Sequence, residues 1–170
     1  KITHAGAGVG ALASSKTNID DHLKKIFFAS IGPDKINQLR HVRFFRDMDG
    51  ILAHMDKHAA IVGPKFQAVE DALQKRLGGT GLATWTTPKG GYFVSLDVLD
   101  GCAKEIIKRC ADAGVKITPA GATFPYGKDP YDRNIRIAPT LPGVDEINAA
   151  MDVLTAVIEV VCTEKLLKVG

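Results

Sequence analysis

A glycine run near the start of the sequence is the first feature that could carry chemistry. Gly6, Gly8 and Gly10 stand in the segment GAGVGA, which satisfies the dinucleotide-binding pattern G-x-G-x-x-A. In such sites the glycines leave a buried strand and open a helix, and an acidic residue follows about twenty residues later on a second strand. Here Asp20 and Asp21 stand at the beginning of a predicted helix instead. A nucleotide-binding oxidoreductase is therefore disfavoured, and without G-K-[ST] the run is not a P-loop.

Arg136 is the second such feature, because the segment NIRIA places it in a predicted strand. Successive side chains of a strand point to opposite faces, so Ile135 and Ile137 would face one way and Arg136 the other. The strand thus presents Arg136 on a rigid element. Taken alone, this arginine is also typical of an ordinary surface ion pair.

Composition and charge argue against several classes of partner. The chain has 170 residues, of which 45% are hydrophobic and 24% charged, enough for one globular core. Its 22 basic and 19 acidic residues are interspersed, so no basic block predicts nucleic-acid binding, and no apolar run predicts a membrane span. Cys102, Cys110 and Cys162 match no zinc pattern and no disulfide framework. We expect buried, reduced thiols, no metal site and a cytoplasmic protein.

Hydrophobic periodicity predicts the elements that must position these residues. Segments 14–32 and 51–77 have apolar residues every three or four positions, which predicts two amphipathic helices, the first with Asn18 as its N-cap. After residue 81 the period changes to two, and the runs LATWTT and GYFVSLDV predict a β-hairpin.

The rest of the chain completes a predicted two-layer α/β domain from about residue 50 to the end. Short strands are predicted at 115–117 and 134–138, and helices at 103–114 and 144–161.

Four segments together resemble pyridoxal-phosphate-dependent aminotransferases of fold type I. They are KITHAGAGVG, IGPDKINQLRH, PKGGYFVSLD and NIRIAPTLP. Their order is most similar to the bacterial subgroup of class I aspartate aminotransferases that is related to MocR-type aminotransferases. The resemblance covers essentially the whole chain, and it corresponds to the C-terminal part of the family's protein from the Schiff-base lysine onward. It implies an α/β small domain plus a remnant of the large domain, and pyridoxal 5'-phosphate as cofactor.

The resemblance implies roles for two residues. Lys1 matches the lysine that binds the cofactor covalently and moves the proton of the substrate's α-carbon, which requires an amine with an accessible free-base form. Arg136 matches the arginine that binds the substrate's α-carboxylate, because a planar guanidinium can pair with both carboxylate oxygens. Without the resemblance, Lys1 would be interpreted as an exposed terminal lysine.

One position departs from the family pattern. Many class I members have an arginine eight positions after the Schiff-base lysine to hold the cofactor's phosphate, and here that position is Val9. Backbone N–H groups, upstream hydroxyls or a partner subunit would then bind the phosphate. The glycine run would let the chain pass close beside the cofactor and the dimer partner.

The segment from Lys35 to His41 matches the part of the family that contributes side chains across the dimer. Arg40 is the first candidate to bind the second carboxylate of a dicarboxylic substrate, and Lys35 is the second. The alternative is a solvated helix start. His22, His54 and His58 are expected to be surface or packing residues.

These expectations divide the chain into residues 1–49, a remnant of the large cofactor-binding domain and dimer-interface segment, and residues 50–170, a connecting helix and the small domain. The intact protein would be a homodimer that moves an amino group between an amino acid, with aspartate as one candidate, and a 2-oxo acid. The residues that hold the cofactor's ring and phosphate would precede Lys1, in an N-terminal remainder of the same protein, so we expect this segment alone to be inactive.

Apolar residues of the first part, including Phe28, Phe44 and Phe45, would lack their packing partners. The alternative function is a non-catalytic effector-binding domain of a MocR-type transcription regulator.

Overall fold

The computed structural model describes residues 3–4 and 6–169, so Lys1 lies outside the described residues. The chain forms two compact units, residues 1–60 and 61–170, and the boundary falls inside helix α3 (Met48–Leu77). The predicted domain division at residue 49 stays a prediction.

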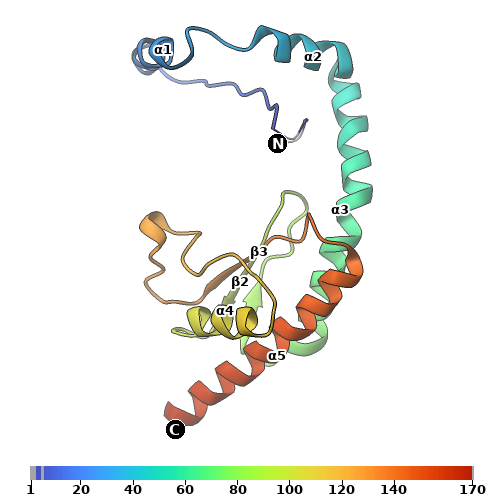
Figure 1. Ribbon diagram of the computed structural model, residues 1–170, viewed down its shortest axis with the longest axis vertical. Coiled ribbons are helices and arrows are strands. Elements are labelled where there is room, and N and C mark those ends of the chain that lie inside the picture. Colours follow the sequence, from blue (N-terminus) through green and yellow to red (C-terminus); the bar gives the residue numbers. More distant parts are fainter. Residues whose placement is uncertain (1–2, 5, 170) are drawn as a thin grey trace. The chain divides into compact units, whose positions relative to one another are not determined.

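The first unit consists of the glycine run, α1 (Lys16–Ser30), α2 (Lys35–Phe45) and the beginning of α3 (Figure 1). Ser15 is the N-cap of α1, and its hydroxyl accepts a hydrogen bond from the backbone N–H of Asn18 at 3.4 Å. The prediction of Asn18 as the cap is therefore wrong by three positions, because four residues of capping type, at positions 14, 15, 17 and 18, stand close together. Asp34 caps α2 in the same way, through the backbone N–H of Asn37 at 2.9 Å.

Most apolar side chains of the first unit face solvent in this chain. Phe28 is 87% exposed and Phe44 is 57% exposed, as predicted for a segment without its packing partners. Phe45 is different: it is 5% exposed, because its ring packs against the rings of His4 and His54. The expectation that Phe45 would lack a partner is wrong.

The second unit is built on a three-stranded antiparallel sheet in the order β1-β2-β3. Its strands are β1 (Ala83–Trp85), β2 (Val94–Val98) and β3 (Asn134–Ile137), and its helices are the end of α3, α4 (Ala103–Asp112), the short 3-10 helix η1 (Pro125–Gly127) and α5 (Val144–Val169). The predicted hairpin is confirmed, since β1 pairs with β2.

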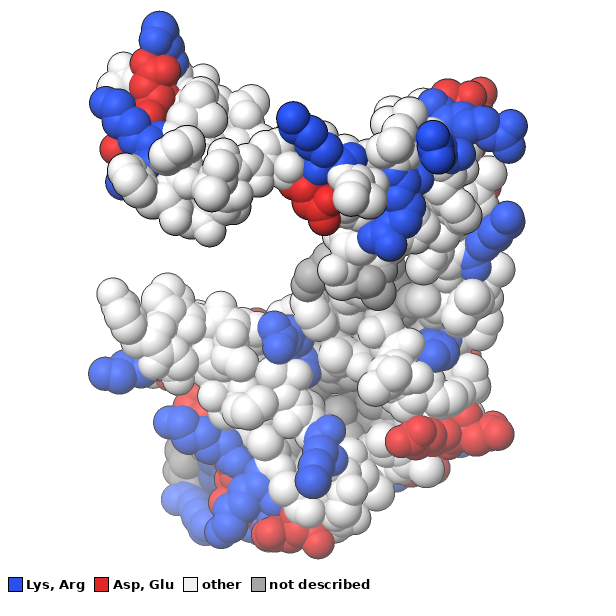
Figure 2. Space-filling model, turned by 45° about the horizontal axis from the view of Figure 1, so that its top comes forward, with Lys and Arg blue, Asp and Glu red and all other residues white. Residues whose placement is uncertain are grey.

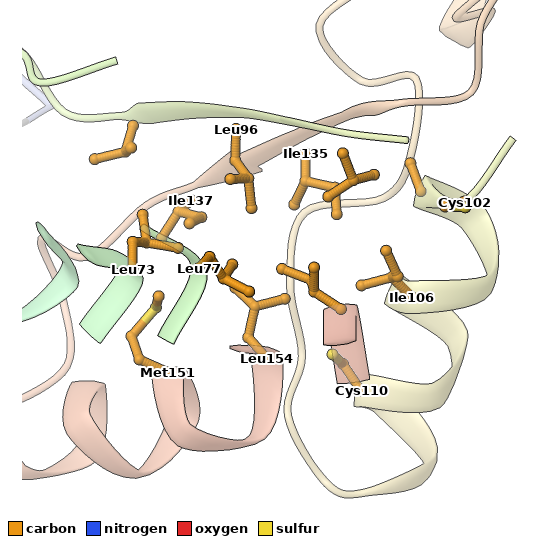
Figure 3. Packing of buried hydrophobic residues seen from close by; sticks show 14 of the residues in the cluster. Leu73, Leu77, Leu96, Cys102, Ile106, Cys110, Ile135, Ile137, Met151 and Leu154 are labelled. Atoms are coloured by element: carbon orange, nitrogen blue, oxygen red, sulfur yellow. The ribbon is translucent and has the colours of Figure 1, made fainter. Parts of the chain in front are cut away.

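One face of this sheet packs against the helices and forms the core (Figure 3). The strands contribute residues from alternate positions, and the three helices contribute residues spaced along one side. The labelled core residues in the figure are Leu73, Leu77, Leu96, Cys102, Ile106, Cys110, Ile135, Ile137, Met151 and Leu154. This arrangement confirms the predicted two-layer α/β fold of the small domain.

The predicted strand at 115–117 does not form. Val115 and Ile117 pack against the core, but within the described residues this segment pairs with no strand. Alternating apolar residues allow the side chains to be buried, but a strand also needs an adjacent strand to pair with its backbone N–H and C=O groups.

The three cysteines are buried, as predicted. Burial raises the pKa of the Cys110 thiol to about 11. Within residues 3–4 and 6–169, no three His, Cys, Asp or Glu side chains are grouped so that they could hold a metal ion.

None of the helices in the described part of the chain combines the length and apolar composition needed to cross a bilayer. On the face drawn in Figure 2, Lys and Arg side chains lie in small separate groups with uncharged surface between them.

Truncating a core leucine of α5 should destabilise the second unit strongly. Leu154 is 2% exposed, whereas Leu167 on the same helix is 78% exposed. Leu154→Ala should lower the free energy of unfolding by about 2–5 kcal/mol, because it removes buried apolar surface and leaves a cavity. Leu167→Ala, the matched control, should change it by less than about 0.5 kcal/mol. Urea unfolding followed by the fluorescence of Trp85 measures both, and equal effects would contradict the core assignment.

Candidate active site

Arg136 is held in place by its strand. Its neighbours Ile135 and Ile137 are buried in the core, and Arg136 lies opposite Ser95 in the register of β2 and β3. The side chain therefore leaves the other face of the sheet, as the alternation predicted. Its guanidinium carbon lies 4.5 Å from the centre of the Phe93 ring, a cation–π contact that fixes the plane of the group.

The guanidinium of Arg136 differs from those of the other arginines in the second unit. Arg76, Arg109 and Arg133 each form an ion pair with a carboxylate. None of the ion pairs among the described residues involves Arg136, and its Nε atom is buried without a hydrogen-bond partner. A buried donor that lacks an acceptor costs free energy. A bound carboxylate would satisfy it, and the ordinary surface ion pair is not formed in the described structure.

A cavity of about 600 Å³ lies beside Arg136. Its walls come from Val69 of α3, the segment 114–118, the end of β3 with the residues that follow it, and the first half of α5. Most wall residues are apolar, and Lys116 and Glu146 are the charged ones besides Arg136. Neither Arg136 nor Lys116 forms an ion pair with the described residues, and a mostly apolar cavity with such cations suits a small organic anion.

Asp129 stabilises the loop before β3 through hydrogen bonds. Its carboxylate accepts hydrogen bonds from the backbone N–H groups of Tyr131 at 3.0 Å, Arg133 at 2.8 Å and Asn134 at 2.8 Å. Partial burial raises the pKa of Asp129, but these donors more than offset it, so the pKa lies below its ordinary value. The carboxylate thus fixes the point at which the strand of Arg136 begins.

Replacing Asp129 should therefore have a pH-dependent effect. In Asp129→Asn the amide group replaces one acceptor oxygen and the charge is lost. We expect a loss of about 1–2 kcal/mol of stability at pH 7, a modest value because the carboxylate is partly exposed. A depressed carboxyl pKa stabilises the fold above the ordinary value of 3.8, and this stabilisation is lost as the pH falls through the lower folded pKa. Urea unfolding from pH 7 to pH values well below 3.8 should show the two proteins converging only below that value, and a constant difference over the whole range would contradict the assignment.

Arg40 and Lys35, the predicted second cation site, lie on α2 in the first unit. Both are exposed, and Arg40 donates from Nη2 to the Asn37 side-chain oxygen at 2.7 Å. Asn37 in turn donates to the carbonyl of Ala7 at 3.0 Å, which ties α2 to the glycine run. Because Arg136 belongs to the other unit, a common site for these residues stays a prediction.

Two glycines of the run have open space beside them in the described chain. Gly6 has a φ of +72°, a conformation that glycine adopts readily, and a Cβ at Gly6 or Gly10 would meet nothing within 4 Å. Val9, at the position where the resemblance implies an arginine in many class I members, is 50% exposed. Close passage of the run beside a cofactor or partner subunit stays a prediction.

A histidine cluster next to Thr3 was not predicted from the sequence. His54 packs against the ring of Phe45, as expected of a surface or packing residue, and its Nε2 atom also lies 3.0 Å from the carbonyl oxygen of Thr3. The Nε2 atom of His41 lies 2.8 Å from the hydroxyl of the same residue. The spacing of His54 and His58, four positions apart on one helix face, was the available signal.

Comparison with known proteins places the chain in a family. The family model described as aspartate amino-transferase matches residues 1–169. A protein of Mycolicibacterium smegmatis that is described as an aminotransferase is 52% identical over 98% of this chain and 39% of its own length. The crystal structure of an aspartate transaminase from Corynebacterium glutamicum has a TM-score of 0.83 and 41% identity, over 89% of this chain and 36% of the other.

A more distant structure shares the fold. The alpha-aminoadipate aminotransferase of Thermus thermophilus, solved in complex with N-(5'-phosphopyridoxyl)-L-leucine, has a TM-score of 0.70 at 17% identity, over 89% of this chain and 38% of the other. The chain therefore belongs to the aspartate aminotransferase family and has the fold of type I aminotransferases. It spans about two fifths of the length of these relatives.

Proposed function

We propose that this chain forms the C-terminal part of a pyridoxal-phosphate-dependent aminotransferase that moves an amino group between an amino acid and a 2-oxo acid. Membership of the family supports the class of reaction. The observation that carries the proposal is the buried, unpartnered Nε atom of Arg136 beside a cavity. Every amino acid and every 2-oxo acid has the carboxylate that such a group binds.

The donor chemistry of the chain fits the cofactor and its substrate. The primary amine of Lys1 suits the aldehyde of pyridoxal 5'-phosphate, and Arg136 suits the substrate's α-carboxylate. When bound, the cofactor supplies an electron sink for a bond broken at the substrate's α-carbon. The distant relative from Thermus thermophilus was solved with a phosphopyridoxyl compound, which supports the same cofactor here.

Each of these residues would have a separate role in the reaction. Arg136 binds the α-carboxylate in two parallel hydrogen bonds and so orients the α-carbon. The amine of Lys1 accepts the proton that leaves the α-carbon. Arg40, with Lys35 as the second candidate, binds the outer carboxylate of a dicarboxylic substrate such as aspartate.

The intact protein is proposed to be a cytoplasmic homodimer related to the MocR-type aminotransferases, with Lys1 as the Schiff-base lysine. An N-terminal remainder supplies the residues around the cofactor's ring and phosphate. The proposal of an N-terminal remainder is supported by the length of the relatives, of which this chain spans about two fifths.

Cofactor binding tests the proposal. The full-length protein should bind pyridoxal phosphate at one per subunit, and borohydride reduction should attach it to Lys1. A polypeptide of residues 1–170 alone should not bind it saturably at micromolar concentrations, because an amine by itself holds an aldehyde weakly. Absorbance titration and peptide mass spectrometry measure both. Saturable binding by residues 1–170 would contradict the division of roles, and the absence of binding to the full-length protein would contradict the function.

A further inference from the structure

Thr3 is held at two of its oxygen atoms by histidine rings from two helices. The hydroxyl lies 2.8 Å from Nε2 of His41 on α2, and the carbonyl oxygen lies 3.0 Å from Nε2 of His54 on α3. All three residues are partly buried, so these hydrogen bonds are shielded from water.

The geometry also determines where the ring protons lie. Nδ1 of His41 is 2.8 Å from the carbonyl oxygen of Asn37, which only accepts, so this nitrogen carries the proton. In the neutral ring, Nε2 of His41 then accepts from the hydroxyl of Thr3. His54 must donate from Nε2, because its partner is a carbonyl oxygen. Nε2 of His58 lies 3.0 Å from the same nitrogen and is therefore an acceptor.

Aromatic rings close the cluster around Thr3. His4 contacts the rings of Phe44, Phe45, His41 and His54, at centroid distances of 4.9, 5.3, 5.0 and 5.9 Å. Burial, followed by the charges of neighbouring groups that include Arg40, lowers the pKa of His4. The cluster is thus a packed group of aromatic rings around Thr3.

We propose that His41 and His54 are positioning residues that fix Thr3 and thereby set where the chain places Lys1, two positions earlier. Consecutive Cα atoms are about 3.8 Å apart, so fixing one residue limits the space open to a residue two positions away. The inference rests on the proposed function, because the position of Lys1 matters only if its amine does chemistry. A misplacement of about 1 Å can reduce a rate about a hundredfold.

The test compares variants that remove one contact with variants that keep it, in the full-length protein with its cofactor. His54→Leu removes the donor to the carbonyl of Thr3, and His54→Gln keeps an N–H donor at a similar distance. Thr3→Val removes the hydroxyl that His41 contacts and keeps the shape of the side chain. His22→Leu is the control, since His22 is an exposed histidine on α1.

Three readouts separate positioning from a general loss of structure. They are kcat and KM for the amino acid, the pH midpoint of the bound cofactor's absorbance change, and the rate at which an acylating reagent modifies Lys1 in the cofactor-free protein. His54→Leu and Thr3→Val should each lower kcat at least about tenfold with KM changed less than about threefold. Both should shift the pH midpoint and the acylation rate, whereas His54→Gln and His22→Leu should stay within about threefold of the parent protein in every rate.

Unchanged kcat, pH midpoint and acylation rate in His54→Leu and Thr3→Val would overturn the inference and leave the proposed function intact. An equal fall of kcat in His54→Leu and His54→Gln would also overturn it, because the N–H donor that is kept in His54→Gln would then not contribute to turnover. A parent protein that carries no cofactor on Lys1 would overturn the proposed function and this inference together.

Discussion

Replacing Lys1 by alanine in the full-length protein is expected to reduce turnover of every amino acid by at least about a thousandfold. The variant loses both the covalent attachment of the cofactor and the base that accepts the proton from the α-carbon, and proton transfer by a positioned group alone contributes about a hundredfold to ten-thousandfold. Steady-state kcat with aspartate and with alanine measures the effect.

Lys1→Arg is the matched control for charge. It keeps a cation at the position, but a guanidinium remains protonated at working pH and offers no free amine. It should be as inactive as the alanine variant. If Lys1→Arg kept activity within about tenfold of the parent protein, a charge and not an amine would be required there, and the Schiff-base assignment would be wrong.

Replacing Arg136 by lysine should lower kcat/KM for all amino-acid substrates to a similar degree. A lysine keeps the charge but loses one of the two parallel hydrogen bonds to the α-carboxylate, at a cost on the order of 2–3 kcal/mol, or about a 30- to 150-fold lower kcat/KM. The loss should be similar for aspartate and alanine, because both carry the same α-carboxylate. Stability should change little, since Arg136 forms no ion pair with the described residues.

Arg40→Ala provides the contrast to Arg136→Lys. It should reduce kcat/KM for aspartate selectively and leave alanine nearly unaffected, because only a dicarboxylic substrate has a second carboxylate. A parallel loss for aspartate and alanine would contradict the assignment of Arg40 and move the role to Lys35, which the corresponding variant Lys35→Ala would test. An Arg136→Lys enzyme that discriminated between the two substrates would contradict the α-carboxylate assignment.

Local patterns were sufficient to predict most elements of the second unit. The hairpin of β1 and β2, the outward side of Arg136 and the helix α5 follow from spacing alone, because each depends on which face of one element is buried. The strand expected at 115–117 failed, since a strand also needs a free edge beside it, and apolar spacing does not report one.

The candidate site depends more on contacts between distant segments. The position of Arg136 in a strand could be predicted from the sequence. The cavity beside it could not, because it is formed by segments up to about 70 positions away along the chain. The missing hydrogen-bond partner of the Arg136 Nε atom is likewise not visible in any local sequence pattern. The contacts of Thr3 with His41 and His54 span 38 and 51 positions. Their geometry arises only when the helices and the chain start have packed together.

The transfer of an isotope label tests the central claim most directly. The full-length protein is incubated with pyridoxal phosphate, ¹⁵N-labelled aspartate and an unlabelled 2-oxo acid such as 2-oxoglutarate, and the products are analysed by mass spectrometry. The account predicts that ¹⁵N appears in the amino acid formed from the acceptor, in a one-to-one ratio with the 2-oxo acid formed from the donor, and that Lys1→Ala abolishes the transfer. Stoichiometric cofactor binding without transfer from any member of a panel of amino acids would contradict the account and favour an effector-binding domain of a transcription regulator.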